Sequence, residues 1–439
     1  MINPKPRRIL FVLSNQQYFR NYIESKALSK IKIDCVFLVS NNISRRQIRK
    51  LGKNKIYVYN YPVKKTDLHQ YLFNINTKKF INRSRTFEFR YKRISSKFKI
   101  LYAVFASPVI YHIVKTIILT LTQDNNLSRV IAKVNPNLIL IPSSGYEGGA
   151  FEIIKIANDR KIPTLMLIDN WDNLCSKTIL TRKPNFMSVW GRQTKKHAIR
   201  IHGMKSDQIF ILGTPRFIQY FNARDKKPPS LYPFKYALFA GNALAFDELT
   251  TLREIDRLIE KGGQELTIIY RPHPWRHPRL SPDTFFDFDF KHVKLDEDAK
   301  KYYKRELGDS YAPDLSYYPK LLANMQFMIC PLSTMLVEGL LFDKRVFILT
   351  YDDGIHFTNP KNAFKYYEHF EGIGRLANVT IIDTFDSLVK IADHGTRKNN
   401  ISNRGSVALD YYITSDTANY QSNLKKITDK IMDSWNYQK

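Results

Sequence analysis

The chain has 439 residues and a formal net charge of +29, and 44% of its residues are hydrophobic. This length allows two domains of roughly 200 residues, each with its own core, and the hydrophobic fraction excludes a disordered chain. The three cysteines lack CxxC or Cys/His spacing, which argues against disulfides and structural zinc and fits a reducing cytosolic setting. The positive charge predicts an anionic partner, which is nucleic acid, an anionic membrane surface or a phosphorylated substrate.

The first half of the chain alternates short apolar runs with helical periodicity. We expect strands at residues 9–13, 33–39, 56–59, 138–142, 164–168, 186–189 and 209–212, and helices at 18–28, 127–134 and 150–159. Such alternation predicts a parallel, doubly wound sheet. No hydrophobic leader precedes residues 9–13, so we expect the protein to stay in the cytosol.

Residues 78–121 interrupt this pattern with a basic segment followed by an apolar one. Between Lys78 and Lys99, nine Lys or Arg residues accompany a single acid, Glu88. Residues 100–121 are then apolar except for His112, Lys115 and a few hydroxyls. This stretch fits a transmembrane helix, a helix lying on the membrane, or an ordinary core helix. The basic segment predicts attachment to the inner face of the cell membrane or, equally, a solvated face.

The second half begins after a charged, proline-containing segment with no apolar periodicity, which is typical of a linker. We therefore expect an N-terminal domain at residues 1–222, a linker at 223–233 and a C-terminal domain at 234–439. Expected strands lie at 236–240, 266–270, 327–330 and 346–349, and expected helices at 246–261, 317–323, 334–341 and 420–435. Two doubly wound domains imply a cleft between them, with ligands bound beyond the carboxyl ends of the strands.

Arg271 and His273 follow the expected strand 266–270. Pro272 and Pro274 fix the backbone on either side of His273, so its imidazole is held at a strand end. A fixed imidazole can donate to phosphate oxygens or act as an acid near neutral pH, and Arg271 can add a bidentate phosphate contact. The alternative is a purely structural turn.

Ser333 and Thr334 follow the expected strand 327–330 and open a helix. A hydroxyl cap and free N–H groups at this point suit the diphosphate of a nucleotide. Glu338 lies one turn later on the same side, where a carboxylate can hold a ribose diol. Gly241 and Asn242 follow strand 236–240 and can contact the nucleotide as well. A capped helix with a surface glutamate is the alternative.

Two loops of the first half offer a catalytic base. Glu147 lies in a glycine-rich loop between a strand and a helix, where Gly145 lets a substrate approach the backbone closely. Residues 169–173 follow the next strand and contain Asp172, the second candidate base. Trp171 and Asn170 in this loop could bind the acceptor, Trp171 by stacking on a sugar or base. Either loop is alternatively a tight turn.

The second-half motifs, RPHP at residues 271–274 and STMLVEGLLFDKRVFILTYDD at 333–353, resemble the nucleotide-binding half of GT-B glycosyltransferases. The branch most similar includes CDP-glycerol glycerophosphotransferases and capsule sugar transferases. DNWDNLCSK at 169–177, VWG at 189–191 and GTPRF at 213–217 also resemble segments of surface-carbohydrate enzymes. The resemblance implies that His273 binds the nucleotide phosphates, that Ser333 and Thr334 hold the diphosphate, and that Glu338 holds the ribose.

We therefore expect a GT-B protein that transfers a sugar from a nucleotide donor, for example a CMP-linked one, to a lipid-linked or surface glycan. The base is Glu147 or Asp172, and His273, Arg271 and the helix dipole stabilise the leaving phosphate. No DxD with supporting ligands follows a strand, so we expect neither a metal nor a cofactor. The alternatives are a CDP-glycerol or CDP-ribitol phosphotransferase, a sugar-nucleotide 2-epimerase and an inactive scaffold. Nucleic acid is not an expected partner, because no recognition module is present.

Overall fold

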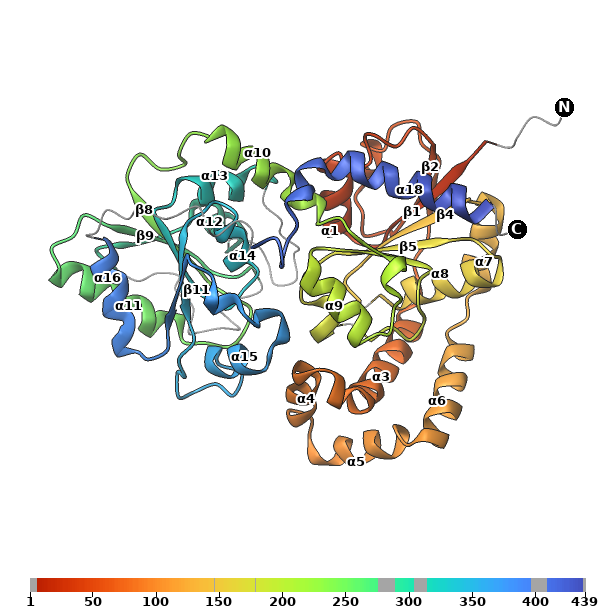
Figure 1. The fold of residues 1–439 in the computed structure, drawn as a ribbon, viewed down its shortest axis with the longest axis horizontal. Coiled ribbons are helices and arrows are strands. Elements are labelled where there is room, and N and C mark those ends of the chain that lie inside the picture. The colour runs from red at the N-terminus through yellow and green to blue at the C-terminus, as the bar shows by residue number, and fades with distance from the viewer. Residues whose placement is uncertain are drawn as a thin grey trace. The chain divides into compact units, whose positions relative to one another are not determined.

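A computed structural model describes residues 6–145, 147–177, 179–274, 289–303, 314–395 and 409–436 of the protein. The chain forms two compact units. Unit 1 comprises residues Met1–Ile218 and Tyr411–Lys439, and unit 2 comprises residues Gln219–Asp410. Each unit is built on one parallel sheet with helices packed on it (Figure 1). Unit 2 is thus inserted into the chain of unit 1.

The sheet of unit 1 has seven strands within the described residues, in the order β3-β2-β1-β4-β5-β6-β7. All neighbouring strands are parallel. The chain runs outward from β1 to β3 and returns to the other side of β1 at β4, so the strand order reverses between β1 and β4. The strands are β1 (Arg8–Leu13), β2 (Asp34–Val39), β3 (Ile56–Val58), β4 (Leu138–Ser143), β5 (Thr164–Ile168), β6 (Phe186–Val189) and β7 (Ile209–Ile211).

Both faces of this sheet are covered, which explains the continuous apolar runs of its strands. Side chains alternate between faces along β1. Leu10 and Val12 join a core with α7 (Asn125–Val134) and α8 (Gly148–Asp159). Ile9 and Phe11 join a core with the final helix, α18 (Tyr420–Asn436). The other helices packed near this sheet are α1 (Gln16–Tyr18), a π-helix (Phe19–Glu24), α2 (Arg45–Arg49) and α9 (Arg192–Arg200).

Four α-helices lie between β3 and α7. They are α3 (Val63–Lys79), α4 (Arg85–Lys92), α5 (Ser96–Phe105) and α6 (Pro108–Leu121). The apolar stretch 100–121 is therefore not one helix: it breaks at Ala106 and Ser107, Pro108 opens α6, and the two axes are bent by 91°. Within the described residues, no single helix is long and apolar enough to cross a membrane. The bent pair α5 and α6 meets that test by length and composition only.

The sheet of unit 2 has six parallel strands within its described part, in the order β10-β9-β8-β11-β12-β13. Here the order reverses between β8 and β11. The strands are β8 (Tyr236–Ala240), β9 (Thr267–Arg271), β10 (Val293–Leu295), β11 (Phe327–Pro331), β12 (Arg345–Leu349) and β13 (Val379–Ile382). The helices are α10 (Ile218–Lys226), α11 (Glu248–Lys261), α12 (Glu297–Tyr303), α13 (Tyr317–Asn324), α14 (Met335–Leu340), α15 (Pro360–Tyr366) and α16 (Val389–Gly395).

The expectation of two doubly wound parallel α/β domains and a C-terminal helix is confirmed. The boundaries differ from those expected. Helix α10 occupies residues 218–226, across the start of the expected linker, and the chain from Tyr411 onward packs in unit 1 instead of with residues 234–410. The last helix returns because its apolar side, including Leu424 and Ile431, completes the core beside β1.

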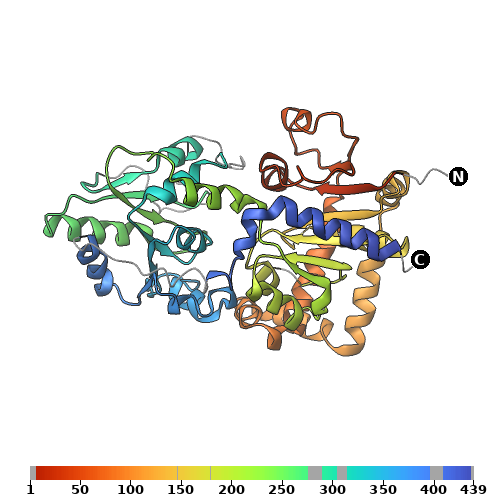
Figure 2. The ribbon, with the colours of Figure 1, turned by 45° about the horizontal axis from the view of Figure 1, so that its top comes forward.

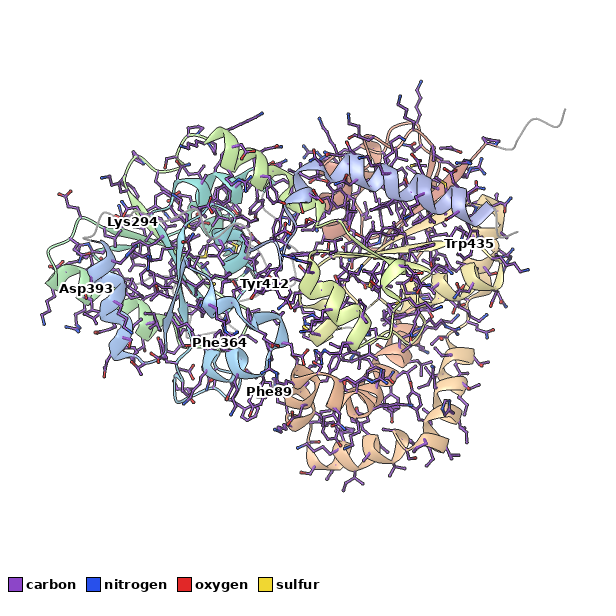
Figure 3. All side chains as sticks on the ribbon, in the orientation of Figure 1. Phe89, Lys294, Phe364, Asp393, Tyr412 and Trp435 are labelled. Carbon is purple, nitrogen blue, oxygen red and sulfur yellow. The ribbon has the colours of Figure 1, made fainter. Side chains whose placement is uncertain are left out.

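The returning C-terminal segment is attached to unit 1 at several points. The N–H of Gln193 donates to the carbonyl of Tyr411 at 2.8 Å, and the N–H of Thr414 donates to that of Trp190 at 2.9 Å. Helix α18 then lies along unit 1, as Figure 2 shows. At its far end the indole of Trp435 donates to the carbonyl of Lys161 at 2.9 Å (Figure 3).

Gly191 is one position where the returning segment passes close to the chain that follows β6. A Cβ at residue 191 would lie 2.6 Å from the carbonyl oxygen of Tyr412 and 2.7 Å from that of Tyr411. Backbone atoms cannot move aside as a flexible side chain can. We expect Gly191→Ala to lower the free energy of unfolding of unit 1 by about 3 kcal/mol, measured by denaturant titration. The control is Gly52→Ala, which meets nothing within 4 Å and costs only its positive φ of 64°, about 1 kcal/mol. Equal losses in the two variants would contradict the proposed clash.

Candidate functional site

Glu147 lies just beyond the carboxyl end of β4, where the strand order of unit 1 reverses. Its Oε2 accepts hydrogen bonds from the hydroxyl of Ser143 at 3.0 Å and from the N–H groups of Ser144 at 3.2 Å and Gly145 at 3.1 Å. Its Oε1 accepts a hydrogen bond from the hydroxyl of Tyr18. Gly145 has a φ of 88°, which lets the loop fold back on this carboxylate. The half-buried carboxylate of Glu147 is therefore fixed in direction at the expected ligand edge.

Tyr18 follows β1 on α1 and is fully buried. Burial, and next the neighbouring Glu147 carboxylate, raise the pKa of Tyr18 well above its ordinary value. The phenol therefore stays protonated and acts as a donor. Its oxygen also lies 2.8 Å from the hydroxyl of Ser144. Tyr18 thus connects the segment after β1 to the glycine-rich loop after β4.

Asp169 is a second carboxylate at this edge, and sequence reasoning missed its role. It comes directly after β5 and is 0% exposed. It accepts hydrogen bonds from the amide of Asn21 at 3.0 Å and from the amide of Gln17. Gln17 and Asn21 flank Tyr18, so one short segment after β1 holds both acids. The signal was present in the sequence, because an apolar strand ending in Asp is typical of a site at a strand end.

The other predicted residues of this loop have structural partners. The carboxylate of Asp172 pairs with Lys177 at 2.9 Å and accepts from the hydroxyl of Ser176 at 3.2 Å. Trp171 was expected to stack on the acceptor; its side chain is 1% exposed and packs edge to face on Tyr412, with ring centroids 6.0 Å apart. Asn170 is half-buried and accepts from Arg216 at 3.3 Å.

The titration of Asp169 gives a test of this geometry. Burial raises its pKa above the ordinary value of 3.8, although the positive charge of Arg216 and the Asn21 hydrogen bond oppose the rise. The folded protein therefore binds this proton more tightly than the unfolded chain does, and folding stability falls as the pH rises through the interval between the two pKa values. We expect Asp169→Asn to remove this fall and to raise the melting temperature at neutral pH by about 3 °C. Melting curves from acid to neutral pH measure the effect. If the melting temperatures of the original protein and of Asp169→Asn changed with pH in the same way, Asp169 would not be a buried carboxylate that becomes charged as the pH rises.

In unit 2, Gly241 and Asn242 follow β8 where the strand order reverses. The amide of Asn242 donates to the carbonyl of Pro331 at 2.8 Å and so joins the ends of β8 and β11. Its N–H donates to the carboxylate of Glu248 at 3.0 Å, and a Cβ at Gly241 would lie 2.6 Å from the same carboxylate. Asn242 is 1% exposed. The structure therefore gives these two residues a framework role rather than an open face for a nucleotide.

Arg271, the last residue of β9, is 6% exposed. Its Nε donates to the hydroxyl of Tyr318 at 2.9 Å, and its guanidinium lies 5.0 Å from the centre of that ring. The buried carboxylate of Asp296 lies in the same network and accepts hydrogen bonds from Tyr317 and, at 2.9 Å, from Tyr232. Tyr318 therefore uses the Nε donor of Arg271, which is one of the N–H groups available for the expected phosphate contact. His273 follows at the strand end and is half-buried.

Ser333 and Thr334 lie between β11 and α14, as expected, and both are half-buried. The hydroxyl of Ser333 accepts from the N–H of Met335 at 3.3 Å and so caps the helix. Glu338 is 5% exposed, so it is not the surface glutamate that the alternative interpretation of this helix assumed. The hydroxyl of Tyr220 donates to its carboxylate at 2.6 Å. Tyr220 lies 118 residues away in sequence, and no local pattern points to this contact.

Asp353 and His356 form a further polar group after β12, the neighbour of β11. The imidazole Nδ1 of His356 lies 2.7 Å from the carboxylate of Asp353. That carboxylate also accepts from the N–H of Asp247 at 3.1 Å, at the start of α11. The carboxyl edge of unit 2 thus carries two histidines, His273 and His356, within its described part.

No family model matches the chain, and no curated protein matches its sequence. Solved structures do match it along nearly its whole length. A putative UDP-N-acetylglucosamine 2-epimerase from Listeria monocytogenes is 12% identical, with 97% of each chain covered and a TM-score of 0.57. The UDP-GlcNAc 2-epimerase from Methanocaldococcus jannaschii is 13% identical, with 95% of this chain and 99% of that chain covered and a TM-score of 0.53. The glycosyltransferase of kitacinnamycin is 10% identical, with 96% and 99% covered and a TM-score of 0.50.

These likenesses establish the fold, which is GT-B. The similar structures are enzymes, both sugar-nucleotide epimerases and glycosyltransferases. One of them, the UDP-GlcNAc 2-epimerase from Neisseria meningitidis, is bound to UDP-GlcNAc; it is 11% identical, with 96% and 100% covered and a TM-score of 0.51. At these identities the likenesses show the GT-B fold alone, and the resemblance to the CDP-glycerol branch stays a prediction.

Proposed function

We propose that the protein is a metal-independent glycosyltransferase. Unit 2 binds a nucleotide-sugar donor, and unit 1 binds the hydroxyl-bearing acceptor, a glycan or lipid-linked glycan. The observation that carries the proposal is Glu147, a carboxylate held by surrounding donors at the strand-order reversal of unit 1. A base in fixed orientation at this edge suits deprotonation of an acceptor hydroxyl.

In the proposed reaction, Glu147 takes the proton of the acceptor hydroxyl as its oxygen bonds to the anomeric carbon of the donor. The bond from that carbon to the phosphate oxygen breaks, and the nucleotide leaves with the bonding electrons. His273 and the N–H groups near Ser333 and Thr334 stabilise the negative charge that develops on the leaving phosphate. Asp172 is the weaker candidate for the base, because its carboxylate already pairs with Lys177.

Glu338 is the proposed ribose ligand. Its carboxylate is buried and is oriented by the hydroxyl of Tyr220, and a carboxylate held in a fixed direction suits hydrogen bonds from a diol. Arg271 would stabilise the phosphates through its positive charge at the strand end. No cofactor is needed, because the activated donor is itself a substrate.

A sugar-nucleotide 2-epimerase is the second candidate. The observation that favours it is the pair Glu147 and Asp169, which the segment Gln17–Asn21 holds at one edge of unit 1. Inversion at C2 of a sugar requires proton removal and return, for which two acids in one unit suffice.

Incubation of the purified protein with UDP-, GDP- and CMP-sugars and with CDP-glycerol and CDP-ribitol tests the proposal. Release of nucleotide from a sugar donor, accelerated by a glycan acceptor, is the expected result. Turnover of CDP-polyols alone would contradict sugar transfer and support the phosphotransferase alternative. Deuterium uptake at C2 of UDP-GlcNAc in D₂O, without nucleotide release, would instead support the epimerase.

A further inference from the structure

We propose that α5 and α6 form a docking surface for an anionic lipid bilayer. The α5–α6 surface consists of apolar side chains that are between 37% and 72% exposed: Phe98, Ile100, Leu101 and Val104 of α5, and Val109, Ile110, Ile113, Ile117 and Leu121 of α6. These nine are more than half of the sixteen exposed large apolar side chains of the described residues. Apolar groups gathered in this way mark an interaction site, whereas scattered ones need no explanation.

The same two helices bury a different set of side chains. Tyr102 of α5 and Tyr111 and Ile118 of α6 pack with Leu72 and Ile75 of α3. The hydroxyl of Tyr111 donates to the side-chain oxygen of Asn76 at 2.7 Å. The helices are therefore already fixed on α3 through one face. The outward apolar residues recur at spacings of three and four, as 100, 101 and 104 do on α5 and as 109, 110, 113, 117 and 121 do on α6, and this places them on a second face.

The lengths of the helices favour a surface position over a span. Helix α5 has 10 residues and α6 has 14, whereas a helix crossing a bilayer needs roughly 20. The bend of 91° between them prevents the two from forming one straight rod. Amphipathic helices of this kind lie in the interface, with the apolar side among the acyl chains.

The charge of the residues around the α5–α6 surface indicates which partner binds it. No Asp or Glu occurs between Glu88 and Asp124, while six Lys or Arg residues do: Arg90, Lys92, Arg93, Lys97, Lys99 and Lys115. Lys92 pairs with Glu88 and Arg90 donates to the carbonyl of Ser176. Anionic lipid head groups complement the other cations, each contributing about 1 kcal/mol near the surface. A second copy of the chain would bring the same cations against each other. An anionic bilayer is therefore the favoured occupant, and it would place the protein peripherally on the membrane.

Vesicle flotation of the full chain tests this inference independently of any turnover. We expect the protein to float with vesicles of phosphatidylcholine mixed with phosphatidylglycerol, less with phosphatidylcholine alone, and less as salt is raised. The double variant Ile100→Asp/Ile113→Asp should lose at least about tenfold in binding, because both residues are outward and each helix carries one change. Lys97→Ala should lose about fivefold.

The matched control is Val63→Asp/Val389→Asp, which changes two equally apolar exposed residues elsewhere, 75% and 43% exposed, and should float like the unaltered chain. Melting curves establish that all variants are folded. Absence of flotation with anionic vesicles would overturn the inference, as would equal flotation of the double variant. A change from dimer to monomer on Ile100→Asp/Ile113→Asp, without vesicle binding, would identify a second copy as the occupant instead.

Discussion

Glu147→Gln is expected to lower kcat for sugar transfer by about 10²- to 10⁴-fold, because it removes the proposed base and keeps its size. Donor affinity should stay unchanged, since the residues proposed to bind the nucleotide belong to unit 2. The N–H groups of Ser144 and Gly145 can still donate to the remaining carbonyl oxygen, so the loop should keep its shape. Initial rates with a saturating donor, together with calorimetric donor binding, measure the two effects separately.

Asp172→Asn is the matched control, because Asp172 is the alternative candidate base and lies in a loop at the same sheet edge. Its carboxylate is used by Lys177 and Ser176, so we expect less than about a threefold change in kcat and a small loss of stability. If Asp172→Asn lowered kcat strongly and Glu147→Gln did not, Asp172 would be identified as the base. Loss of donor binding in Glu147→Gln would show that the change had altered the fold or that Glu147 contacts the nucleotide.

His273→Ala is expected to lower kcat/KM by about 10²- to 10³-fold, because the imidazole at the end of β9 would donate to the leaving phosphate. The loss should be greatest for donors with the poorest leaving groups, because these depend most on a proton or hydrogen bond. Steady-state kinetics with a series of nucleotide donors measures this dependence.

His292→Ala provides the control within the same unit. His292 precedes β10, at the amino edge of the sheet, and pairs with Glu260 at 2.9 Å. Its replacement should leave turnover within about twofold of the original, since ligands bind at the carboxyl edge. Full activity in His273→Ala would place the site elsewhere or indicate an inactive scaffold, and equal losses in both variants would show a general effect on unit 2.

Most of the sheet was predictable, because parallel strands buried on both faces leave long apolar runs in the sequence. Strand β8 coincides with the expected residues 236–240, and β5 with 164–168. Strand β10 was missed because it has three residues and a lysine at its centre. Helix α4 was missed because its sequence RTFEFRYK alternates apolar and charged residues, a pattern with a period of two rather than that of a helix.

The strand ends that carry candidate residues were also predictable, but the accessibility of each side chain was not. Trp171 is covered by Tyr412, and Glu338 is paired with Tyr220. Arg271 donates a hydrogen bond to Tyr318, and its charge interacts with that of Asp296. Each of these partners is distant in sequence. The residue pattern within one strand or loop does not predict contacts that form only when distant segments pack together.

The insertion of unit 2 into unit 1 sets the order in which the chain can fold during synthesis. The ribosome produces β1–β7 first and α18 last, with all of unit 2 between them. Domains normally fold in the order in which they emerge, but here unit 1 must wait for its final residues. Until Leu424 and Ile431 emerge, the sheet face around Ile9 and Phe11 lacks its cover. Unit 2 is therefore the first part of the nascent protein that can reach its native state, and unit 1 is the part most in need of a chaperone.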